Sequence, residues 1–309
     1  MDDLSPPPPL TGRRILVTGV TGQVALPVAL HLAADNDVIG LARFGDPAAR
    51  ERLEAAGVTC VPCDLAKGIG DDVPTDVDHV VNFAVVKSGR WEVDLRANAE
   101  AAGLLMAHCA GARSVLHCSS TGVYQPAGSH RLVETDPLGD NHRVIMPTYS
   151  IAKIATEAVV RTMARHLGLP TTIARLNVPY GDNGGWPAFH LEMILAGQAV
   201  PVHPDRPNLF NPIHADDITA TLPGLLEAAS VPATIVNWGG HEPVSLEDWC
   251  LELGRLVGRP VELVETDATI GGVTVDLTKM EALVEPTSVP WREGMRSMVA
   301  AAHPEALVG

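Results

Sequence analysis

Basic side chains, and lysine above all, are scarce in this chain. Its 309 residues carry a formal net charge of −15 at pH 7, and its only lysines are Lys67, Lys87, Lys153 and Lys279. A surface that binds nucleic acid or an anionic membrane requires a basic face. The charge therefore argues against both partners, and we expect a small-molecule substrate whose anionic groups meet a few placed cations and backbone amides.

Cysteine is rare as well. The five cysteines make an odd count without the spacing of a disulfide framework, which suits reduced thiols in the cytoplasm. Cys60 and Cys63 form a C-x-x-C pair, but the pair straddles the end of an expected strand and contains Pro62, so that we expect neither a redox nor a metal role. The histidines show no ligand spacing, and no metal site is expected.

Long apolar runs are also missing. No run approaches the ~20 residues that a membrane helix needs, and no basic-then-apolar leader opens the chain. Apolar residues nevertheless make up 46% of the sequence, enough for an ordinary packed core. The composition indicates a cytoplasmic protein of one large domain or two smaller ones.

Short apolar runs alternate with helical patterns through the first half of the chain. Expected strands lie at 14–18, 37–42, 58–62, 77–84, 114–119 and 171–175, and expected helices at 22–34, 47–56, 94–110 and 148–167. Continuous apolar strands separated by helices are typical of a parallel sheet covered on both faces. With right-handed crossovers, the pattern predicts an α/β fold with a doubly wound parallel sheet, the Rossmann fold.

The pattern changes after Gly181, where prolines and glycines cluster and the expected elements become short. We assign residues 13–177 to a dinucleotide-binding Rossmann domain. Residues 178–305 are assigned mostly to a smaller C-terminal substrate-binding lobe, from which one strand, at about 234–238, returns to the sheet. Residues 1–12, with four consecutive prolines, are expected to form a disordered tail.

The first expected strand runs directly into a glycine-rich turn, TGVTGQVA at 18–25. Glycines at 19 and 22 permit a tight turn and let backbone amides approach a pyrophosphate, and the following helix adds partial positive charge. Because the turn stands between the first strand and the first helix of a βαβ series, it predicts a dinucleotide site formed by Gly19, Thr21, Gly22, Gln23 and Val24.

The residue that ends the second strand, Arg43, bears on the choice of cofactor. An acidic residue there binds the ribose 2′-hydroxyl of NAD, whereas a guanidinium can bind a 2′-phosphate in bidentate fashion. Arg43 therefore favours NADP, with NAD as the alternative, unless it is simply a solvated strand-end charge. Further cofactor contacts are expected after the third and fourth strands, from Asp64, which is otherwise a turn-forming residue, and from Leu65, Phe83 and Ala84.

Tyr149 and Lys153 lie one helical turn apart at the start of the long expected helix. An ammonium beside a phenol, together with a positively charged nicotinamide, favours phenolate over the ordinary tyrosine pKa of about 10. Tyr149 can then take a proton from an alcohol, or give one to a carbonyl, as hydride crosses to or from the cofactor. Ser120, which follows the fifth strand, can hydrogen-bond the same substrate oxygen, with Ser119 and Thr121 as neighbouring alternatives.

Together the motifs resemble those of the extended short-chain dehydrogenase/reductase family, also called the NAD(P)-dependent epimerase/dehydratase family. The resemblance covers nearly the whole chain and rests on TGVTGQVA at 18–25, CSSTGVY at 118–124, YSIAK at 149–153, ARLNVPYG at 174–181 and NPIHADDIT at 211–219. It implies a catalytic group of Ser120, Tyr149 and Lys153, with Asn98 supporting the lysine and residues around Pro179 contacting the nicotinamide end. It also implies a homodimer built on the helices at 94–110 and 148–167.

Two departures from the family pattern concern the substrate. Members that act on nucleotide sugars carry arginines for the diphosphate, but Phe210 stands at one such position and the segment 266–276 contains no arginine. A diphosphate without cations is costly away from water, although Arg206 could substitute from a shifted loop. Other candidates for substrate binding are Lys87, Thr121, Asn177 and Trp186.

Three hypotheses about function follow. The first is an NAD(P)-dependent oxidoreductase that transfers hydride to or from a small carbonyl or alcohol by a Ser-Tyr-Lys mechanism. The second is an NAD(P)-dependent epimerase or dehydratase of sugars or nucleotide sugars, and the third is a non-catalytic protein that senses NADP. The complete set of Ser120, Tyr149 and Lys153 favours an enzyme, and the missing diphosphate arginines favour the first hypothesis.

Overall fold

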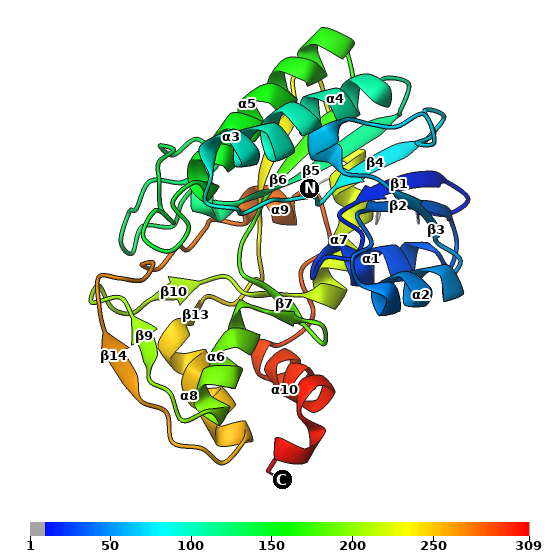
Figure 1. Cartoon of the computed structure of the whole chain (residues 1–309). Coiled ribbons are helices and arrows are strands. Elements are labelled where there is room, and N and C mark those ends of the chain that lie inside the picture. Colours follow the sequence, from blue (N-terminus) through cyan, green and yellow to red (C-terminus); the bar gives the residue numbers. More distant parts are fainter. Residues whose placement is uncertain (1–9, 309) are drawn as a thin grey trace.

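The computed structural model describes residues 10–308, and seven parallel strands form its central sheet (Figure 1). They are β1 (Arg14–Thr18), β2 (Asp37–Ala42), β3 (Thr59–Pro62), β4 (His79–Asn82), β5 (Ser114–Ser120), β6 (Thr171–Leu176) and β12 (Thr234–Trp238). Their order across the sheet is β12-β6-β5-β4-β1-β2-β3, and every pairing is parallel. The predicted doubly wound parallel sheet is confirmed.

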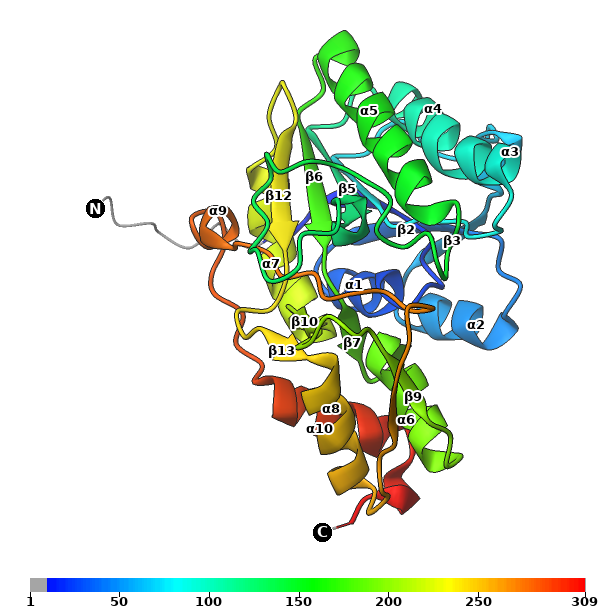
Figure 2. The ribbon, with the colours of Figure 1, turned by 90° about the vertical axis from the view of Figure 1, so that its left-hand side faces the viewer.

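Helices cover both faces of this sheet, so that side chains alternating along a strand are buried on either side. One face carries α3 (Trp91–Asp94), the π-helical segment η2 (Leu95–Glu100), α4 (Ala101–His108) and α5 (Tyr149–Leu167), and the other carries α1 (Ala25–Leu32), α2 (Pro47–Ala55) and α7 (Ala215–Glu227) (Figures 1 and 2). In β1, Ile15 and Val17 belong to the core around α1 and α7, whereas Leu16 belongs to the core around α4 and α5. No helix in residues 10–308 is both long and apolar enough to cross a membrane.

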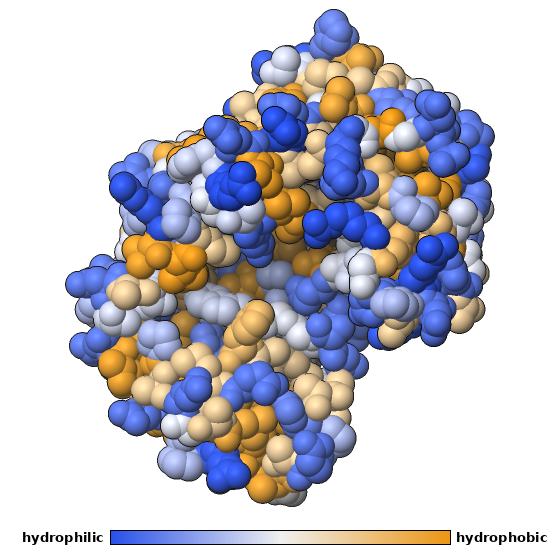
Figure 3. All heavy atoms as spheres, in the orientation of Figure 1, coloured by the Kyte–Doolittle hydropathy of each residue, from blue (hydrophilic) through white to orange (hydrophobic). Residues whose placement is uncertain are grey.

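A smaller lobe built from short elements lies beside the carboxyl edge of the sheet, and Figure 3 shows a hollow between the two parts. Its helices are α6 (Trp186–Leu195), α8 (Leu246–Leu256) and α10 (Trp291–Ala302), and its strands are β7 (Pro179–Gly181), β8 (Gly184–Gly185), β9 (Val200–Val202), β10 (Leu209–Phe210), β11 (Ile213–His214), β13 (Val244–Ser245) and β14 (Leu263–Glu265). Short pieces complete the chain: η1 (Leu65–Lys67), η3 (Thr121–Val123), α9 (Thr278–Glu281) and η4 (Pro304–Ala306).

Helix α7 returns to the sheet together with β12, whereas the sequence indicated only the returning strand. Strands β6 and β12 are parallel neighbours, and a crossover between parallel neighbours packs back onto the sheet. Helix α7 forms part of this crossover, and the indole of Trp238 on β12 donates a hydrogen bond to Thr221 on α7 (2.9 Å).

Residues 1–9 of the predicted tail lie outside the described residues, but its last residues belong to the folded domain. The side chain of Asn36 donates to the carbonyl of Leu10 (2.9 Å), and the amide of Gly12 donates to the carbonyl of Asp35 (2.8 Å). The described end of the tail is therefore held against the turn that follows α1.

A buried ion pair joins α5 to the centre of the sheet. Arg175 on β6 donates to both carboxylate oxygens of Glu157 on α5, at 2.9 and 2.8 Å, and both side chains are almost fully buried. Ser119 on β5 donates a third hydrogen bond to Glu157 (2.6 Å). A bidentate pair with this additional partner fixes the helix against two neighbouring strands.

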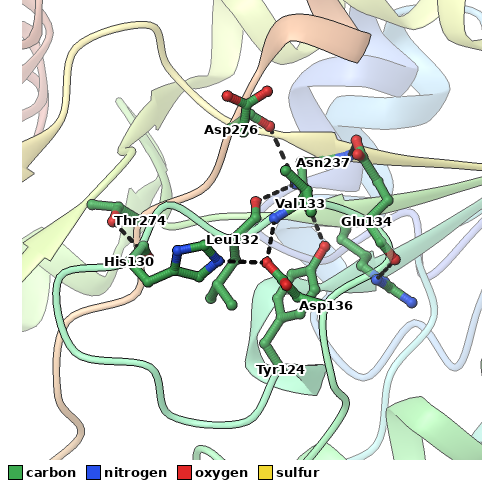
Figure 4. A network of polar contacts seen from close by, with 10 residues as sticks. Tyr124, His130, Leu132, Val133, Glu134, Asp136, Asn237, Thr274 and Asp276 are labelled. Carbon is green, nitrogen blue, oxygen red and sulfur yellow. Dashed lines mark hydrogen bonds and ion pairs between the residues drawn. The ribbon is translucent and has the colours of Figure 1, made fainter.

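A second polar network ties the loop after β5 to β12 (Figure 4). The phenol of Tyr124 donates to Oδ1 of Asn237 (2.5 Å), and Nδ2 of Asn237 donates to the carbonyls of Leu132 (2.9 Å) and Asp276 (3.2 Å). The backbone amide of Asn237 donates to the carboxylate of Glu134 (2.8 Å). The loop that connects β5 with α5 is thereby anchored across the sheet edge.

Removing Arg175 while keeping Glu157 is expected to destabilise the protein strongly. Arg175→Met leaves a buried carboxylate without its counterion, for which a loss of about 3–5 kcal/mol in the free energy of unfolding is typical. Urea-induced unfolding followed by circular dichroism measures the change. Arg255→Met is the control, because Arg255 is mostly exposed in its pair with Glu252 and contributes little. Equally small losses in the two variants would contradict the role of the buried pair.

Candidate active site

The glycine turn after β1 lies against the end of β4, its neighbour in the sheet. Gly19 has a φ of +66°, and a methyl group on it would lie 2.9 Å from the Cα of Ala84. The hydroxyl of Thr18 accepts a hydrogen bond from the amide of Ala84 (3.1 Å) and donates to Asn82 (2.6 Å). Strand order reverses between β1 and β4, which is where α/β sheets form their ligand crevice.

The turn then leads into α1 without a side-chain cap. The amide of Gly22 donates to the carbonyl of Gly19 (2.7 Å), Thr21 is half-buried between them, and α1 begins at Ala25 with no cap hydrogen bond from Val24. The amides of a helix's first turn, together with its partial positive charge, suit an anion.

Gln23 links this turn to the smaller lobe. Its side-chain amide donates to the carbonyl of Gly184 (3.3 Å), and the side chain of Asn183 donates to the carbonyl of Gln23 (2.5 Å). The turn between β7 and β8 therefore lies directly against the glycine turn.

The residues predicted to meet the adenosine half of a cofactor follow β2 and β3. Arg43 is exposed directly after β2. The next carboxylate along the chain, Asp46, accepts a hydrogen bond from the amide of Ala48 in the first turn of α2 (3.0 Å) and so caps that helix. Asp64 accepts from the amide two residues further on (3.3 Å) and caps η1, the turn-forming role that the sequence left open. Leu65 is half-buried and packs against the core.

Ser120 and Tyr149 are neighbours where β5 ends and α5 begins. The Oγ of Ser120 accepts from the amide of Gly122 (3.0 Å), which leaves the hydroxyl hydrogen for another acceptor. Tyr149 is half-buried, and burial raises its pKa, while the charge of Lys87 and the hydroxyl of Ser120 lower it. This edge of the sheet thus holds a hydroxyl donor beside a phenol.

Lys153 is buried, and its ammonium donates to the carbonyl of Cys118 on β5 (2.8 Å). Burial lowers the pKa of Lys153, although Cys118 and Glu157 oppose this shift. The cation on the ring of Tyr149 is Lys87, whose Nζ lies 5.0 Å from the ring centroid. The sequence indicated Lys87 only as a candidate for substrate binding and gave Lys153 the role of acidifying the phenol, so the contact of Lys87 with the ring comes from the structure alone.

His142, from the loop before α5, packs against Tyr149. Its ring centroid lies 5.4 Å from that of Tyr149, and its buried Nδ1 has no hydrogen-bond partner within residues 10–308. Burial lowers the pKa of His142 to about 4, and the charge of Lys87 acts in the same direction. The imidazole is therefore neutral near pH 7, a feature that its place in an irregular loop did not signal.

Asn98 is engaged with the loop that follows β4. Its Nδ2 donates to the carbonyls of Val86 (2.9 Å) and Asp94 (2.7 Å), and its Oδ1 accepts from the amide of Val86 (2.8 Å). The side chain of Asn98 therefore holds the loop after β4, and its support of Lys153 stays a prediction.

Two residues predicted to bind substrate are engaged within the protein. Asn177 is fully buried, donates to a backbone carbonyl (2.8 Å) and accepts from the amide of Asn211 (3.1 Å). Arg206 forms ion pairs with Glu247 (3.2 Å) and Glu265 (3.4 Å). Both side chains thus have partners within the protein, and their binding of substrate stays a prediction.

Aromatic side chains fill the part of the smaller lobe that carries Trp186. Its ring lies 5.2 Å from Phe210, 5.2 Å from His190 and 5.7 Å from Trp249, measured between centroids. Phe210 is 2% exposed, so the position expected to carry an arginine is part of an apolar core. Trp186 is itself half-buried and serves this packing.

Three further predicted residues lie at the sheet edge. Thr121 is buried, and its hydroxyl donates to the carbonyl of Leu176 (3.5 Å). The ring of Phe83 stacks on Trp238, with centroids 6.5 Å apart. Pro179 is half-buried at the start of β7. The side chains of Thr121 and Phe83 therefore contribute to packing.

Metal-ligating side chains do not gather in the described chain: residues 10–308 contain no group of three or more His, Cys, Asp or Glu that could hold an ion. Cys60 and Cys63 are free thiols, and burial raises the pKa of each. Asp217 accepts from the amides of Ser288 (2.7 Å) and Val289 (3.2 Å), and so anchors the chain before α10.

Comparisons with solved structures show the same fold in nucleotide-sugar enzymes. DesIV, a dTDP-glucose 4,6-dehydratase from Streptomyces venezuelae with NAD bound, is 22% identical with a TM-score of 0.82, over 94% of this chain and 97% of that one. UDP-glucuronic acid 4-epimerase from Bacillus cereus, in complex with UDP-glucuronic acid and NAD, is 18% identical with a TM-score of 0.78, over 93% and 98%. At these identities the likeness establishes the fold alone.

Sequence comparisons add the family. The chain is 29% identical over 202 residues to the trifunctional UDP-glucose 4,6-dehydratase/UDP-4-keto-6-deoxy-D-glucose 3,5-epimerase/UDP-4-keto-L-rhamnose-reductase RHM1 of Arabidopsis thaliana. That match covers 60% of this chain but only 28% of the much longer plant protein. Residues 15–239, well over half of the chain, match the family model described as NAD dependent epimerase/dehydratase family. The protein therefore belongs to the NAD dependent epimerase/dehydratase family.

Proposed function

We propose that the protein is an NAD(P)-dependent oxidoreductase that moves hydride to or from a carbon bearing oxygen, with Tyr149 as its acid/base. The observation that carries the proposal is the meeting of Ser120, Tyr149 and the glycine turn at one edge of the sheet. A hydroxyl donor, a phenol with cations nearby and an anion-binding turn are the groups that this chemistry requires.

The glycine turn fits the pyrophosphate of a nicotinamide dinucleotide. A Cβ on Gly19 would lie 2.9 Å from the Cα of Ala84, and glycine avoids this clash. Helix α1 begins without a side-chain cap, so the amides of its first turn can approach a phosphate closely. The hydrogen bond from the amide of Gly22 to the carbonyl of Gly19 (2.7 Å) keeps the turn tight. When bound, the nicotinamide supplies or accepts the hydride.

Proton transfer is assigned to Tyr149, with help from Ser120. The amide of Gly122 orients Ser120, whose hydroxyl can then donate to the substrate oxygen. Tyr149 gives its phenolic proton to a carbonyl oxygen that is being reduced, or takes the proton of an alcohol that is being oxidised. Lys153, fixed on the carbonyl of Cys118, keeps a positive charge near the pair.

The smaller lobe favours a substrate without a diphosphate. Phe210 is buried against Trp186, and Arg206 is already paired with Glu247 and Glu265. Two phosphate charges that lose water without gaining cations are costly. We therefore infer a small or moderately apolar carbonyl or alcohol as substrate.

A nucleotide-sugar epimerase or dehydratase is the second candidate, because the similar solved structures carry such names. Such enzymes return the hydride that they remove, so the cofactor is not consumed. Incubation with NADPH and a panel of simple carbonyls, and in parallel with UDP- and dTDP-sugars, distinguishes the two. Net loss of NADPH absorbance supports the first candidate, and conversion of a sugar without that loss supports the second.

Tyr149→Phe is expected to reduce turnover by at least about 100-fold, because general acid–base catalysis typically contributes 10²–10⁴. Binding of NADPH, followed by its fluorescence, should be retained. Tyr180→Phe is the control, since that hydroxyl makes one long hydrogen bond (3.5 Å) inside the smaller lobe. Full turnover in Tyr149→Phe would refute the assignment and favour a cofactor sensor or another acid.

Gly19→Ala is expected to weaken binding of NADPH by about tenfold or more. A left-handed backbone costs an L-residue roughly 1–2 kcal/mol, and the new methyl group would also press on Ala84. Gly128→Ala is the matched control, because Gly128 has a φ of +59° in an exposed loop with nothing within 4 Å. Equal binding by the two variants would count against the glycine turn as the cofactor site.

Arg43→Ala is expected to weaken binding of NADP by about tenfold or more and to leave NAD nearly unchanged, since charged hydrogen bonds contribute roughly 1.5–3 kcal/mol. Calorimetric titration of each cofactor measures this. Arg52→Ala, at an exposed position on α2, is the control. Equal weakening of both cofactors would exclude a contact between Arg43 and a 2′-phosphate.

A further inference from the structure

The loop between β4 and α3 brings Lys87 to the face of Tyr149. The 5.0 Å between Nζ and the ring centroid lies within the range of a cation–π contact. Lys87 is an exposed residue. Lys153 is buried and donates to the carbonyl of Cys118. The two lysines are therefore not equivalent: one is tied to β5, and the other lies over the acid/base ring.

A buried carboxylate fixes the loop on the C-terminal side of Lys87. Asp94 accepts from the amide (2.9 Å) and the hydroxyl (2.6 Å) of Ser88 and from the amide of Gly89 (3.2 Å). The same carboxylate accepts from the hydroxyl of Thr148 (2.5 Å), the residue that precedes Tyr149. Burial by itself raises the pKa of Asp94, but the hydrogen bonds from Ser88 and Thr148 bring it below the ordinary range, so the group stays ionised.

A buried amide fixes the loop on the N-terminal side. Asn98 exchanges two hydrogen bonds with the backbone of Val86, at 2.8 and 2.9 Å, directly before Lys87. Asn98 and Asp94 lie one turn apart, and Asn98 also donates to the carbonyl of Asp94 (2.7 Å). This Asp94–Asn98 clamp grips the residues on both sides of Lys87 and, through Thr148, ties them to the start of α5.

We infer that Lys87 is a positioning residue of the acid/base site, a cation that the Asp94–Asn98 clamp holds over the phenol of Tyr149 to stabilise its ionised form. The inference rests on the proposed function of Tyr149 and deepens it. Fixing a flexible lysine in one place costs side-chain conformational entropy. Anchoring the backbone on both sides of Lys87 leaves fewer degrees of freedom to be fixed.

Among the groups that influence the pKa of Tyr149, Lys87 is the cation that favours its ionised form. From β5, the hydroxyl of Ser120 lowers the pKa of Tyr149 and the thiol of Cys118 raises it. His142 is neutral near pH 7, because burial lowers its pKa to about 4. Burial remains the largest influence on Tyr149, and it acts against ionisation. The charge of Lys87 opposes it, so loss of Lys87 moves the ionisation of Tyr149 to higher pH.

The test compares Lys87→Met with Lys87→Arg, and uses Lys279→Met on exposed α9 as the control. The chain has three tyrosines, so NMR of the cofactor-free protein labelled at tyrosine Cζ gives three resonances. The resonance that disappears in Tyr149→Phe is that of Tyr149. In Lys87→Met we expect the Tyr149 resonance to titrate at higher pH. The rise of the alcohol oxidation rate with pH should shift to higher pH by the same amount. At pH 7 the oxidation rate should fall about tenfold, since an opposite charge nearby typically favours the ionised form by at least that factor.

Lys87→Arg should restore both curves, and Lys279→Met should leave both as in the wild type. An unchanged Tyr149 titration in Lys87→Met overturns the inference. So does a loss of activity without a shift in that titration, because Lys87 then acts on substrate or cofactor directly. The titration needs no turnover, so failure of the proposed function, seen as an active Tyr149→Phe variant, is distinguished from failure of this inference.

Discussion

The carboxylate of Glu157 sets the relation of α5 to the sheet. Tyr149, Lys153 and Glu157 follow one another at intervals of four residues, so they share one face of the helix. Glu157 accepts from Ser119 on β5 (2.6 Å) and from a guanidinium on β6. Because Ser120 is the next residue of β5, a helix fixed at Glu157 cannot slide by a turn without breaking a buried ion pair. The pairing of hydroxyl and phenol at the active edge depends on that constraint.

Polar groups and aromatic packing are divided between the two parts of the molecule. The sheet edge supplies the turn around Gly19, the hydroxyl of Ser120 and the cations, whereas the smaller lobe presents an aromatic core around Trp186 and Phe210. Gln23 joins the parts by its contacts with the turn between β7 and β8.

In a chain with a net charge of −15 and four lysines, one lysine, Lys87, lies over the ring of Tyr149, and a second, Lys153, follows one helical turn along α5. Lys153 is held by a strand carbonyl, and Lys87 by a loop that Asp94 and Asn98 grip from the helix opposite. The π-helical segment that contains Asn98 lies between α3 and α4. Segments of this kind occur often at functional sites, and here one turns a buried amide toward the loop.

The sequence by itself determined the parallel sheet, the glycine turn and the spacing of Tyr149 and Lys153, because each depends on local periodicity or on residues within one turn. It also marked Phe210 as a departure from the family pattern. It could not determine hydrogen-bond partners, since these come from distant positions that the strand order brings together. Asp94 and Thr148, for example, are 54 residues apart and meet only because α3 and α5 cover the same face. Only the tertiary structure decided that Asn98 binds a loop, that Arg206 is already paired, and that Lys87 lies over the phenol.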